Sequence, residues 1–499
     1  MEIIYNLLFG FGVALQPNNL FMCFIGVLLG TLVGVLPGLG PVAAMSLLLP
    51  ATYHVNPIGA IIMLSGIYYG AMYGGSTTSI LLNIPGEAAS VVTCIDGYMM
   101  ARNGRPGPAL SISAIGSFIG GTISIVGLML VAPPLAEVAL KFGPPEYFSL
   151  MVLGVIMLTF LAGDSMLKAL CMASIGIFLG TIGMDNLSGM ERFTFNISIL
   201  IDGVGLVPVA MGLFGISEVL LNVELSLKRD IFKASLKGLL PNLDDLKQCF
   251  WPIIRGSVIG FFLGILPGGG AVLSSFTSYA MEKKLARHPE LFGKGAIEGV
   301  AGPETANNSA TGGAFIPLLT LGIPPNAVMA ILLGAMLIYG MQPGPMLIKE
   351  HPQLFWGAVT SMYIGNALLL ILNLPLIGIW VKILKIPYYL LFPLIILFCL
   401  VGAYSLNNNT DEIMLMVIFG AIGYFLRKFK YPLAPLVLAL VLGPMLEKTL
   451  RQSLLMGAGS GWIFLSRPIS LVTLLICFVL LVSSILPSIK RKRMVIRED

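Results

Sequence analysis

The sequence predicts an all-α polytopic membrane protein with two inverted-topology repeats. Hydrophobic residues make up 57% of the 499 residues and charged residues only 11%, whereas about a quarter of the residues in soluble domains are charged. Apolar runs such as 354–376 and 469–486 carry no charge and are long enough to cross a bilayer, and the chain provides about 10–14 such segments. A helix-breaking segment interrupts an apolar run in each half of the chain, at matching positions.

The two breakers are residues 34–41, Gly-Val-Leu-Pro-Gly-Leu-Gly-Pro, and residues 264–270, Gly-Ile-Leu-Pro-Gly-Gly-Gly, whose prolines lie 230 positions apart. A proline followed by closely spaced glycines ends a helix and leaves backbone groups unpaired. Hydrocarbon tolerates such a break only where it is buried in protein or lines a cavity. Each breaker is therefore either the middle of a broken helix or the tip of a re-entrant hairpin. Matched breaks in two halves indicate the binding site of a transporter.

A polar patch follows each breaker. The first patch spans 74–86 and holds Gly-Gly-Ser-Thr-Thr-Ser and Asn-Ile-Pro-Gly. The second spans 302–326 and holds Gly-Pro-Glu-Thr-Ala-Asn-Asn-Ser-Ala-Thr-Gly-Gly and Gly-Ile-Pro-Pro-Asn. The Gly-Gly pairs lie 238 positions apart and the Ile-Pro pairs 239 apart, in the same order as the breakers. This order and spacing predict a diverged internal repeat.

Taken in order, the chain divides into five regions. The first repeat core spans 1–108, and four connecting spans occupy 109–223, at 109–132, 148–162, 165–183 and 204–222. The lysine-rich region 224–250 has roughly helical apolar spacing, which predicts a cytoplasmic amphipathic segment on the membrane surface. The second repeat core spans 251–350, and 351–499 holds the C-terminal spans and a basic tail.

Loop charges predict the topology, because cytoplasmic loops are enriched in Lys and Arg. The basic connections lie at 102–105, 228–255, 283–294 and 427–430, and the tail reads Lys-Arg-Lys-Arg at 490–493, so the C-terminus is expected in the cytoplasm. The connection after the first breaker carries no formal charge at 52–57, whereas its counterpart at 283–294 is basic. The turn at 102–105 is basic, whereas its counterpart at 349–351 is balanced. This opposite asymmetry predicts that the repeats are inverted.

A helix that restarts after a breaker exposes unpaired N–H groups and the positive end of its dipole, which suits an anion. Neither polar patch contains Lys or Arg, so backbone, hydroxyl and amide groups are the expected carboxylate ligands. For a single Ser or Thr, the alternative is a hydrogen bond within its own helix. The candidate substrate-binding residues are Gly38, Gly40, Ser76, Thr77, Thr78, Gly268, Gly269, Gly270, Asn307, Asn308 and Ser309.

The same patches offer oxygen ligands for a hard cation such as sodium, which is the expected coupling ion, with the proton as the alternative. Glu304 and Glu298 are either ion or proton ligands or helix caps near the interface. The candidate sodium ligands are Ser79, Asn83, Glu304 and Thr311.

The remaining composition excludes other classes. The six cysteines include no Cys-x-x-Cys and no cluster with the three histidines, so no metal site beyond sodium and no cofactor are expected. No nucleotide-binding loop, Ser-His-Asp set or His-Glu-x-x-His motif is evident, which argues against an enzyme. Basic cytoplasmic loops account for the net charge of +5 without nucleic acid. An ion channel is a third interpretation, but matched central breaks favour a transporter that works by alternating access.

The breakers, together with the stretch from Gly302-Pro303-Glu304 through Gly322-Ile323-Pro324, resemble the large membrane subunit of the tripartite tricarboxylate transporters (TctA-type), and the likeness covers essentially the whole length. The resemblance implies a permease of the bacterial inner membrane that uses an ion gradient to import citrate or related carboxylates. It also implies two partners, a small membrane subunit and a periplasmic solute-binding protein. The family signature falls on Gly38, Gly40, Gly268 and Gly270. The alternative is a sodium- or proton-coupled carboxylate carrier that acts alone.

Overall fold

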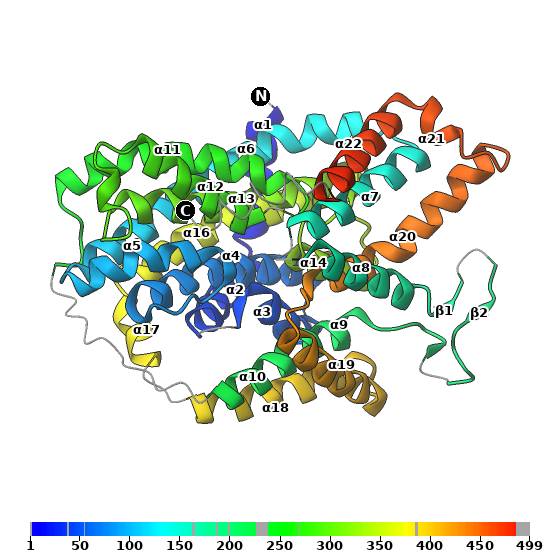
Figure 1. The fold of residues 1–499 in the computed structure, drawn as a ribbon, viewed down its shortest axis with the longest axis horizontal. Coiled ribbons are helices and arrows are strands. Elements are labelled where there is room, and N and C mark those ends of the chain that lie inside the picture. Colours follow the sequence, from blue (N-terminus) through cyan, green and yellow to red (C-terminus); the bar gives the residue numbers. More distant parts are fainter. Residues whose placement is uncertain are drawn as a thin grey trace.

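The computed structural model describes residues 2–36, 39–53, 55–161, 165–185, 188–197, 200–225, 238–268, 270–384 and 388–485. Within these ranges the chain is helical apart from loops and the short strands β1 (Gly183–Met184) and β2 (Glu191–Arg192), which pair antiparallel (Figure 1). Six described helices are long and apolar enough to span a membrane, and seven shorter apolar helices accompany them. The prediction of an all-α polytopic membrane protein is confirmed.

The first core consists of helices that surround one long buried helix. Its elements are α1 (Glu2–Ala14), α2 (Pro17–Val35), α3 (Gly40–Leu48), η1 (Leu49–Thr52), α4 (Pro57–Leu82), η2 (Ala88–Ser90) and α5 (Val91–Arg102). Most of α4 is buried, including every residue from Gly59 to Leu81. A helix that is buried on all sides belongs in the interior of a membrane protein.

The first breaker is the tip of a helical hairpin. Gly34, near the end of α2, lies against Ala71 of α4, and a β-carbon on Gly59, at the start of α4, would lie 3.3 Å from Asn19 at the start of α2. The helices α2 and α4 therefore run parallel. The chain between them must return along their length, so α3 and η1 run back from the breaker.

The second core repeats this arrangement. Its elements are α11 (Leu243–Ile265), α12 (Gly270–Leu285), η5 (Pro289–Leu291), α13 (Glu298–Leu321), α14 (Ala327–Ile338) and α15 (Leu347–Glu350). Glu282, near the end of α12, pairs with Arg255 of α11 at 2.5 Å, and Ser275 donates to the carbonyl of Pro303 in α13. The helix α12 thus folds back on α11, and the second breaker is also a hairpin tip.

Glycines that contact a neighbouring helix recur at the offsets seen in the sequence. A β-carbon on any of six glycines would lie 2.6 Å or less from a carbonyl oxygen of the facing helix. In the first core these contacts are Gly26–Met63, Gly30–Ile67 and Gly34–Ala71, and in the second they are Gly256–Gly302, Gly260–Ala306 and Gly264–Ala310. The glycines differ by 230 positions and their partners by 239. Small residues at these positions let the helices approach closely.

The equivalent helices α4 and α13 lie side by side and run antiparallel. Ser76 Oγ donates to Glu304 Oε2 at 2.5 Å, and the rings of Tyr68 and Phe315 lie 6.3 Å apart. Lower residue numbers in α4 therefore lie beside higher residue numbers in α13. An inverted repeat requires this arrangement, whereas the orientation of each half relative to the two membrane faces stays a prediction.

The other spans pack against the two cores or lie to one side of them and below them (Figure 1). The connecting region holds α6 (Pro106–Ala139), α7 (Pro144–Leu161), α8 (Met166–Gly180), α9 (Leu206–Ala210), the π-helical turn η4 (Met211–Ile216) and α10 (Ser217–Leu225). The C-terminal region holds α16 (Pro352–Asn373), α17 (Ile377–Ile383), α18 (Tyr388–Asn407), α19 (Thr410–Lys428), α20 (Ala434–Met456), α21 (Ile463–Ser466) and α22 (Pro468–Ile485). Of these, α6 lies along α13 and α16 packs against α4.

One predicted segment differs from the structure. Residues 243–250 form the first turns of α11, so the boundary expected after residue 250 falls inside a helix. An Asn242–Asp245 capping box starts α11 there, which the apolar pattern alone does not reveal. Residues 226–237 and the basic tail at 490–493 lie outside the described residues.

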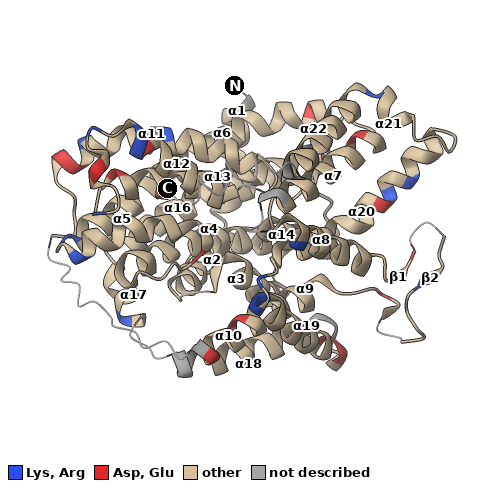
Figure 2. Ribbon diagram, in the orientation of Figure 1, with Lys and Arg blue, Asp and Glu red and all other residues tan. Residues whose placement is uncertain are grey.

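Charged residues gather at helix ends and loops, and the middle of the fold is almost free of them (Figure 2). Arg105 pairs with Asp245 at 2.7 Å, and Arg451 pairs with Asp185 at 2.8 Å. The first pair joins the turn at 102–105 to the first turn of α11, and the charge pattern assigns both segments to the cytoplasmic side. Which face is cytoplasmic stays a prediction.

Candidate functional site

The first half of the candidate site forms where α3 begins. Gly40, the first residue of α3, has a φ of +60°, a value that glycine adopts without strain. A β-carbon on Gly40 would lie 3.9 Å from the β-carbon of Glu87. Glu87 is buried and caps η2, because its Oε2 accepts from the backbone N–H of Ala89 at 2.5 Å. A carboxylate therefore stands beside the restarted helix.

The second half of the site forms in the same way where α12 begins. Gly270 has a φ of +42°, and a β-carbon on it would lie 3.7 Å from Asn326 Nδ2. Asn326 caps α14, because its Oδ1 accepts from the backbone N–H of Met329 at 2.9 Å. The backbone N–H of Gly268 donates to the carbonyl of Pro325 at 2.8 Å, which fixes the hairpin tip against this loop.

Two hydrogen bonds of the same kind join the halves. Asn307 Nδ2 on α13 donates to Glu87 Oε1 at 3.1 Å, and Asn326 Nδ2 donates to the hydroxyl of Tyr68 on α4 at 3.3 Å. Tyr68 and Asn307 lie 239 positions apart, as do Glu87 and Asn326. Each hairpin tip is thus linked, through the residue beside it, to the long buried helix of the other half.

Glu304 is a second buried carboxylate between the halves. Its Oε2 accepts from Ser76 of α4, and its Oε1 accepts from the hydroxyl of Thr93 of α5. Only 1% of Glu304 is exposed, and it lies two turns inside α13, so it is not a helix cap near the interface. Glu298, in the first turn of α13, fits the capping alternative better.

Glu87 and Glu304 are neighbours through α13, because Asn307, which donates to Glu87, lies one turn after Glu304. Among the described residues, all their hydrogen-bond partners are neutral, and neither carboxylate pairs with Lys, Arg or His. Two buried carboxylates without a cationic partner are costly unless a proton or a cation neutralises them. The site therefore combines features for an anion, at the helix starts, with features for a cation.

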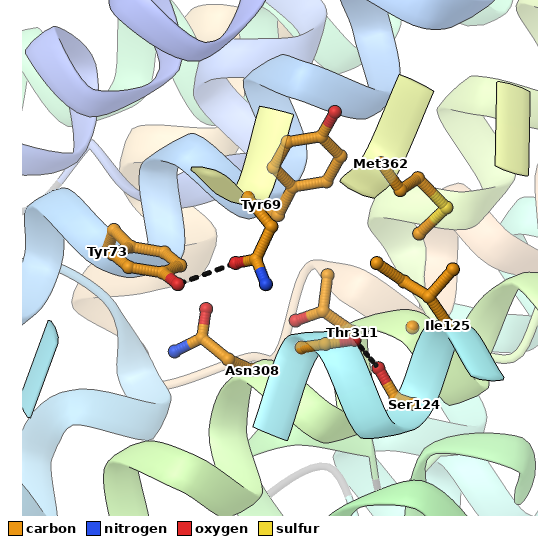
Figure 3. Close-up of a pocket in the computed structure, with 10 residues that line it drawn as sticks. Tyr69, Tyr73, Ser124, Ile125, Asn308, Thr311 and Met362 are labelled. Carbon is orange, nitrogen blue, oxygen red and sulfur yellow. Dashed lines mark hydrogen bonds between the residues drawn. The ribbon is translucent and has the colours of Figure 1, made fainter. Parts of the chain in front are cut away.

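A small cavity lies between α4, α6, α13 and α16 (Figure 3). Its volume of about 20 Å³ holds one water molecule or one small ion. The hydroxyl of Tyr73 donates to Asn366 Oδ1 at 2.6 Å, and Asn308 Oδ1 is buried without a hydrogen-bond partner. Neutral oxygens of this kind suit sodium or water. The lining residues are Tyr69, Tyr73, Gly121, Ser124, Ile125, Asn308, Thr311, Gly312, Met362 and Asn366.

Several predicted ligands also bond to backbone carbonyls. Thr78 Oγ1 donates to the carbonyl of Val35 at 2.8 Å, and Ser309 Oγ donates to that of Ser257 at 2.6 Å. The first bond joins α4 to α2, and the second joins α13 to α11. In each case the partner helix is the arm of the hairpin that precedes the breaker. Thr77 is buried in α4. The predicted substrate ligands Gly38 and Gly269 lie outside the described residues.

The predicted sodium ligands do not form a single cluster. Ser79 Oγ donates to the carbonyl of Gly75 at 3.0 Å or to Ser90 Oγ at 2.9 Å, close to Glu87. Asn83 ends α4 with a φ of 57°, which makes it a left-handed cap. Thr311 Oγ1 donates to the carbonyl of Asn307 and lines the cavity.

Sequence reasoning missed Glu87, Asn326 and Tyr68. Asn326 ends the second patch, and Glu87 comes directly after the first. The offset of 239 was the available signal, because it maps Asn326 onto Glu87 and Asn307 onto Tyr68. This offset pairs Glu87 with Asn326, the polar residues beside the two hairpin tips.

Comparison with known protein families shows the family of this chain. The model described as "Tripartite tricarboxylate transporter TctA family" matches residues 20–438. The chain belongs to the TctA family. Both hairpin tips, both buried helices and every described residue of the candidate site lie inside the matched range. Membership of a transporter family also points away from an enzyme.

Two relatives of this TctA-family chain come from Agrobacterium vitis. One, an uncharacterized 52.8 kDa protein in the TAR-I ttuC' 3' region, is 51% identical over 493 residues, which cover 99% of this chain and 98% of the relative. The other, an uncharacterized protein in the TAR-II ttuC' 3' region, is 51% identical over 234 residues, which cover 47% of this chain and 97% of the relative. A search of the solved structures gave no match.

Proposed function

We propose that this TctA-family protein is the large permease subunit of a tripartite secondary transporter that imports tricarboxylates or related carboxylates such as citrate. One observation carries the proposal. The helices α3 and α12 begin at Gly40 and Gly270, beside Glu87 and Asn326, and these two places are joined through α4 and α13. Two helix starts without a nearby basic side chain suit a substrate with several carboxylates.

The proposed substrate site lies between the two hairpin tips. Backbone N–H groups of the breakers and the second N–H of the Asn307 amide would hold the carboxylates. The predicted ligands Ser76 and Asn308 already donate, Ser76 to Glu304 and Asn308 to Ser117 and the carbonyl of Glu304. Alternating access would then follow from movement of one inverted half against the other, with the substrate held near the middle of the bilayer. The antiparallel run of α4 and α13 supports the inversion.

Sodium is the proposed coupling ion, with the proton as the alternative. The cavity beside Asn308 and Thr311 supports a sodium-sized occupant, because oxygens of neutral groups line it. Glu304 would supply the negative charge, since it lies one turn before Asn308 on α13, and Asn308 lines the cavity and donates to the carbonyl of Glu304. Binding of a cation there would offset part of the charge of an anionic substrate.

The proposed partners are a small membrane subunit and a periplasmic solute-binding protein, as the word tripartite in the family description implies. The proposed location is the inner membrane of a bacterium, with the C-terminus in the cytoplasm. A carboxylate carrier that acts alone is the alternative, and co-purification with the small subunit together with dependence on the binding protein separates the two.

Counterflow in proteoliposomes tests the proposal. Vesicles that hold the permease and its small subunit, preloaded with unlabelled citrate, should accumulate external labelled citrate in the presence of the binding protein. A panel of di- and tricarboxylates, each measured with and without sodium, then defines substrate and coupling ion. Saturable exchange supports a carrier, whereas ion currents without substrate exchange would identify a channel and refute the proposal.

A further inference from the structure

The two halves of the site differ in charge at one equivalent position. Glu87 and Asn326 lie 239 residues apart, each stands beside the first glycine of a restarted helix, and each caps the following helix. Their partners across the interface, Asn307 and Tyr68, are also equivalent. The first half therefore carries a carboxyl group where the second carries a neutral amide.

A carboxylate at this position opposes the binding of an anion. The start of α3 offers N–H groups to a substrate carboxylate, but an ionised Glu87 beside Gly40 repels that carboxylate. The repulsion is strong because Glu87 is only 7% exposed, and water screens it poorly. Asn326 creates no such conflict at the start of α12, since its amide is neutral.

The groups around Glu87 do not neutralise it. Among the described residues, the carboxylate of Glu87 bonds to the backbone N–H of Ala89 and to the amide of Asn307, and no basic side chain pairs with it. The ionisable groups on the helices around it include Glu304 of α13, Tyr68 of α4 and Cys94 of α5, none of them basic. Glu304 adds a second negative charge when it is ionised. A cation from outside the protein is therefore needed before a substrate carboxylate can occupy the start of α3.

An unpaired oxygen stands next to Glu87. The side-chain amide of Asn307 donates its N–H to Glu87 Oε1, and the Oδ1 of the same amide has no hydrogen-bond partner although Asn307 is fully buried. Buried polar atoms almost always have partners, so this oxygen is free to coordinate a ligand. An oxygen beside a carboxylate suits sodium directly, or a proton carried through a bound water.

We propose that Glu87, together with Asn307, binds a monovalent cation, and that this cation permits the substrate carboxylate to bind at the start of α3. The inference rests on the proposed function, because it requires an anionic substrate between the hairpin tips. Cation and substrate then bind cooperatively at the first half of the site. By linkage, each raises the affinity for the other by the same factor, typically about 5- to 150-fold. The second half, with Asn326, binds its carboxylate without this requirement.

Equilibrium binding of labelled citrate to the purified protein tests the proposal. The citrate Kd is measured with sodium or with choline at fixed pH, and then across pH 6 to 8 without sodium. Dependence on sodium at fixed pH identifies sodium as the cation, and dependence on pH alone identifies the proton. In Glu87→Gln the dependence on that cation should fall by about 5-fold or more, whereas Glu87→Asp should retain it.

Two further variants keep the test decisive. Glu304→Gln removes the other buried carboxylate and should leave part of the cation dependence in place. Asn326→Asp adds a carboxylate to the second half and should increase the dependence by about 5-fold or more. Wild-type cation dependence in folded Glu87→Gln would overturn the proposal, and so would unchanged dependence in Asn326→Asp if Glu87→Gln does not fold. Absence of citrate binding to the wild type would instead contradict the proposed function.

Discussion

Ser76 of α4 donates a hydrogen bond of 2.5 Å to Glu304 of α13, and this contact joins the equivalent helices of the two halves at the centre of the fold. Hydrogen bonds to a charged group contribute about 1.5–3 kcal/mol each, more than bonds between neutral groups. We expect Glu304→Gln to lower concentrative citrate uptake by about tenfold or more, because a neutral amide keeps the shape but holds no cation. Uptake is measured in cells with an imposed sodium gradient.

The matched control for this variant is Glu298→Gln, which removes a partly exposed carboxylate from the first turn of the same helix. It should leave uptake within about twofold of the wild type. Equal losses in both variants would show that the charge of α13 as a whole matters and that the buried position of Glu304 does not.

Close packing of glycines makes a stability prediction. A β-carbon on Gly30 or Gly260 would lie within 2.6 Å of a backbone oxygen, so Gly30→Ala and Gly260→Ala should each lower the free energy of unfolding by about 1–3 kcal/mol. Gly12→Ala is the control, because nothing lies within 4 Å of that position and alanine favours a helix. Thermal unfolding in detergent measures all three, and a Tm of Gly30→Ala at or above that of Gly12→Ala would contradict the packing.

The helix start at Gly270 makes a functional prediction. Its φ of +42° disfavours any side chain, and the restarted helix α12 faces the proposed substrate site. We expect Gly270→Leu to abolish citrate counterflow while the protein still inserts into the membrane. Gly340→Leu imposes a similar backbone strain at a φ of +71°, with nothing within 4 Å, and should retain counterflow. Loss of counterflow in both variants would attribute the effect to strain alone.

The proposed inverted orientation of the two halves predicts a labelling pattern. Ala51→Cys, at the exposed end of the first hairpin, and Lys284→Cys, at the exposed end of the second, should react with a membrane-impermeant maleimide from opposite faces. The experiment uses whole cells and inverted vesicles of a variant without native cysteines. Labelling of both positions from one face would disprove the inversion.

Much of the fold was predictable because its strongest signals are local. The apolar runs identified the spans, and Pro-Gly segments identified both hairpin tips, since proline and glycine end helices whatever their surroundings. The choice between a broken helix and a hairpin depended on a long-range contact. The neighbourhood of Gly59 and Asn19, which sets α2 and α4 parallel, has no signature in the local sequence.

The candidate site was predictable only in part. Polar patches without Lys or Arg drew attention to Asn307, Asn308 and Glu304, because amides and carboxylates inside apolar helices require partners. Glu87 lay in a polar turn, where a glutamate is ordinary, and Tyr68 lay in an apolar run, where a tyrosine is ordinary. Their roles depend on the return of two loops to the middle of α4 and α13, which only the fold reveals.

A structure determined with bound citrate and sodium tests the central claim most directly. The account predicts citrate between the two hairpin tips, with carboxylates within hydrogen-bond distance of backbone N–H groups at the starts of α3 and α12, near Gly40 and Gly270. Citrate bound anywhere else in the protein, or held by Lys or Arg side chains, would contradict it.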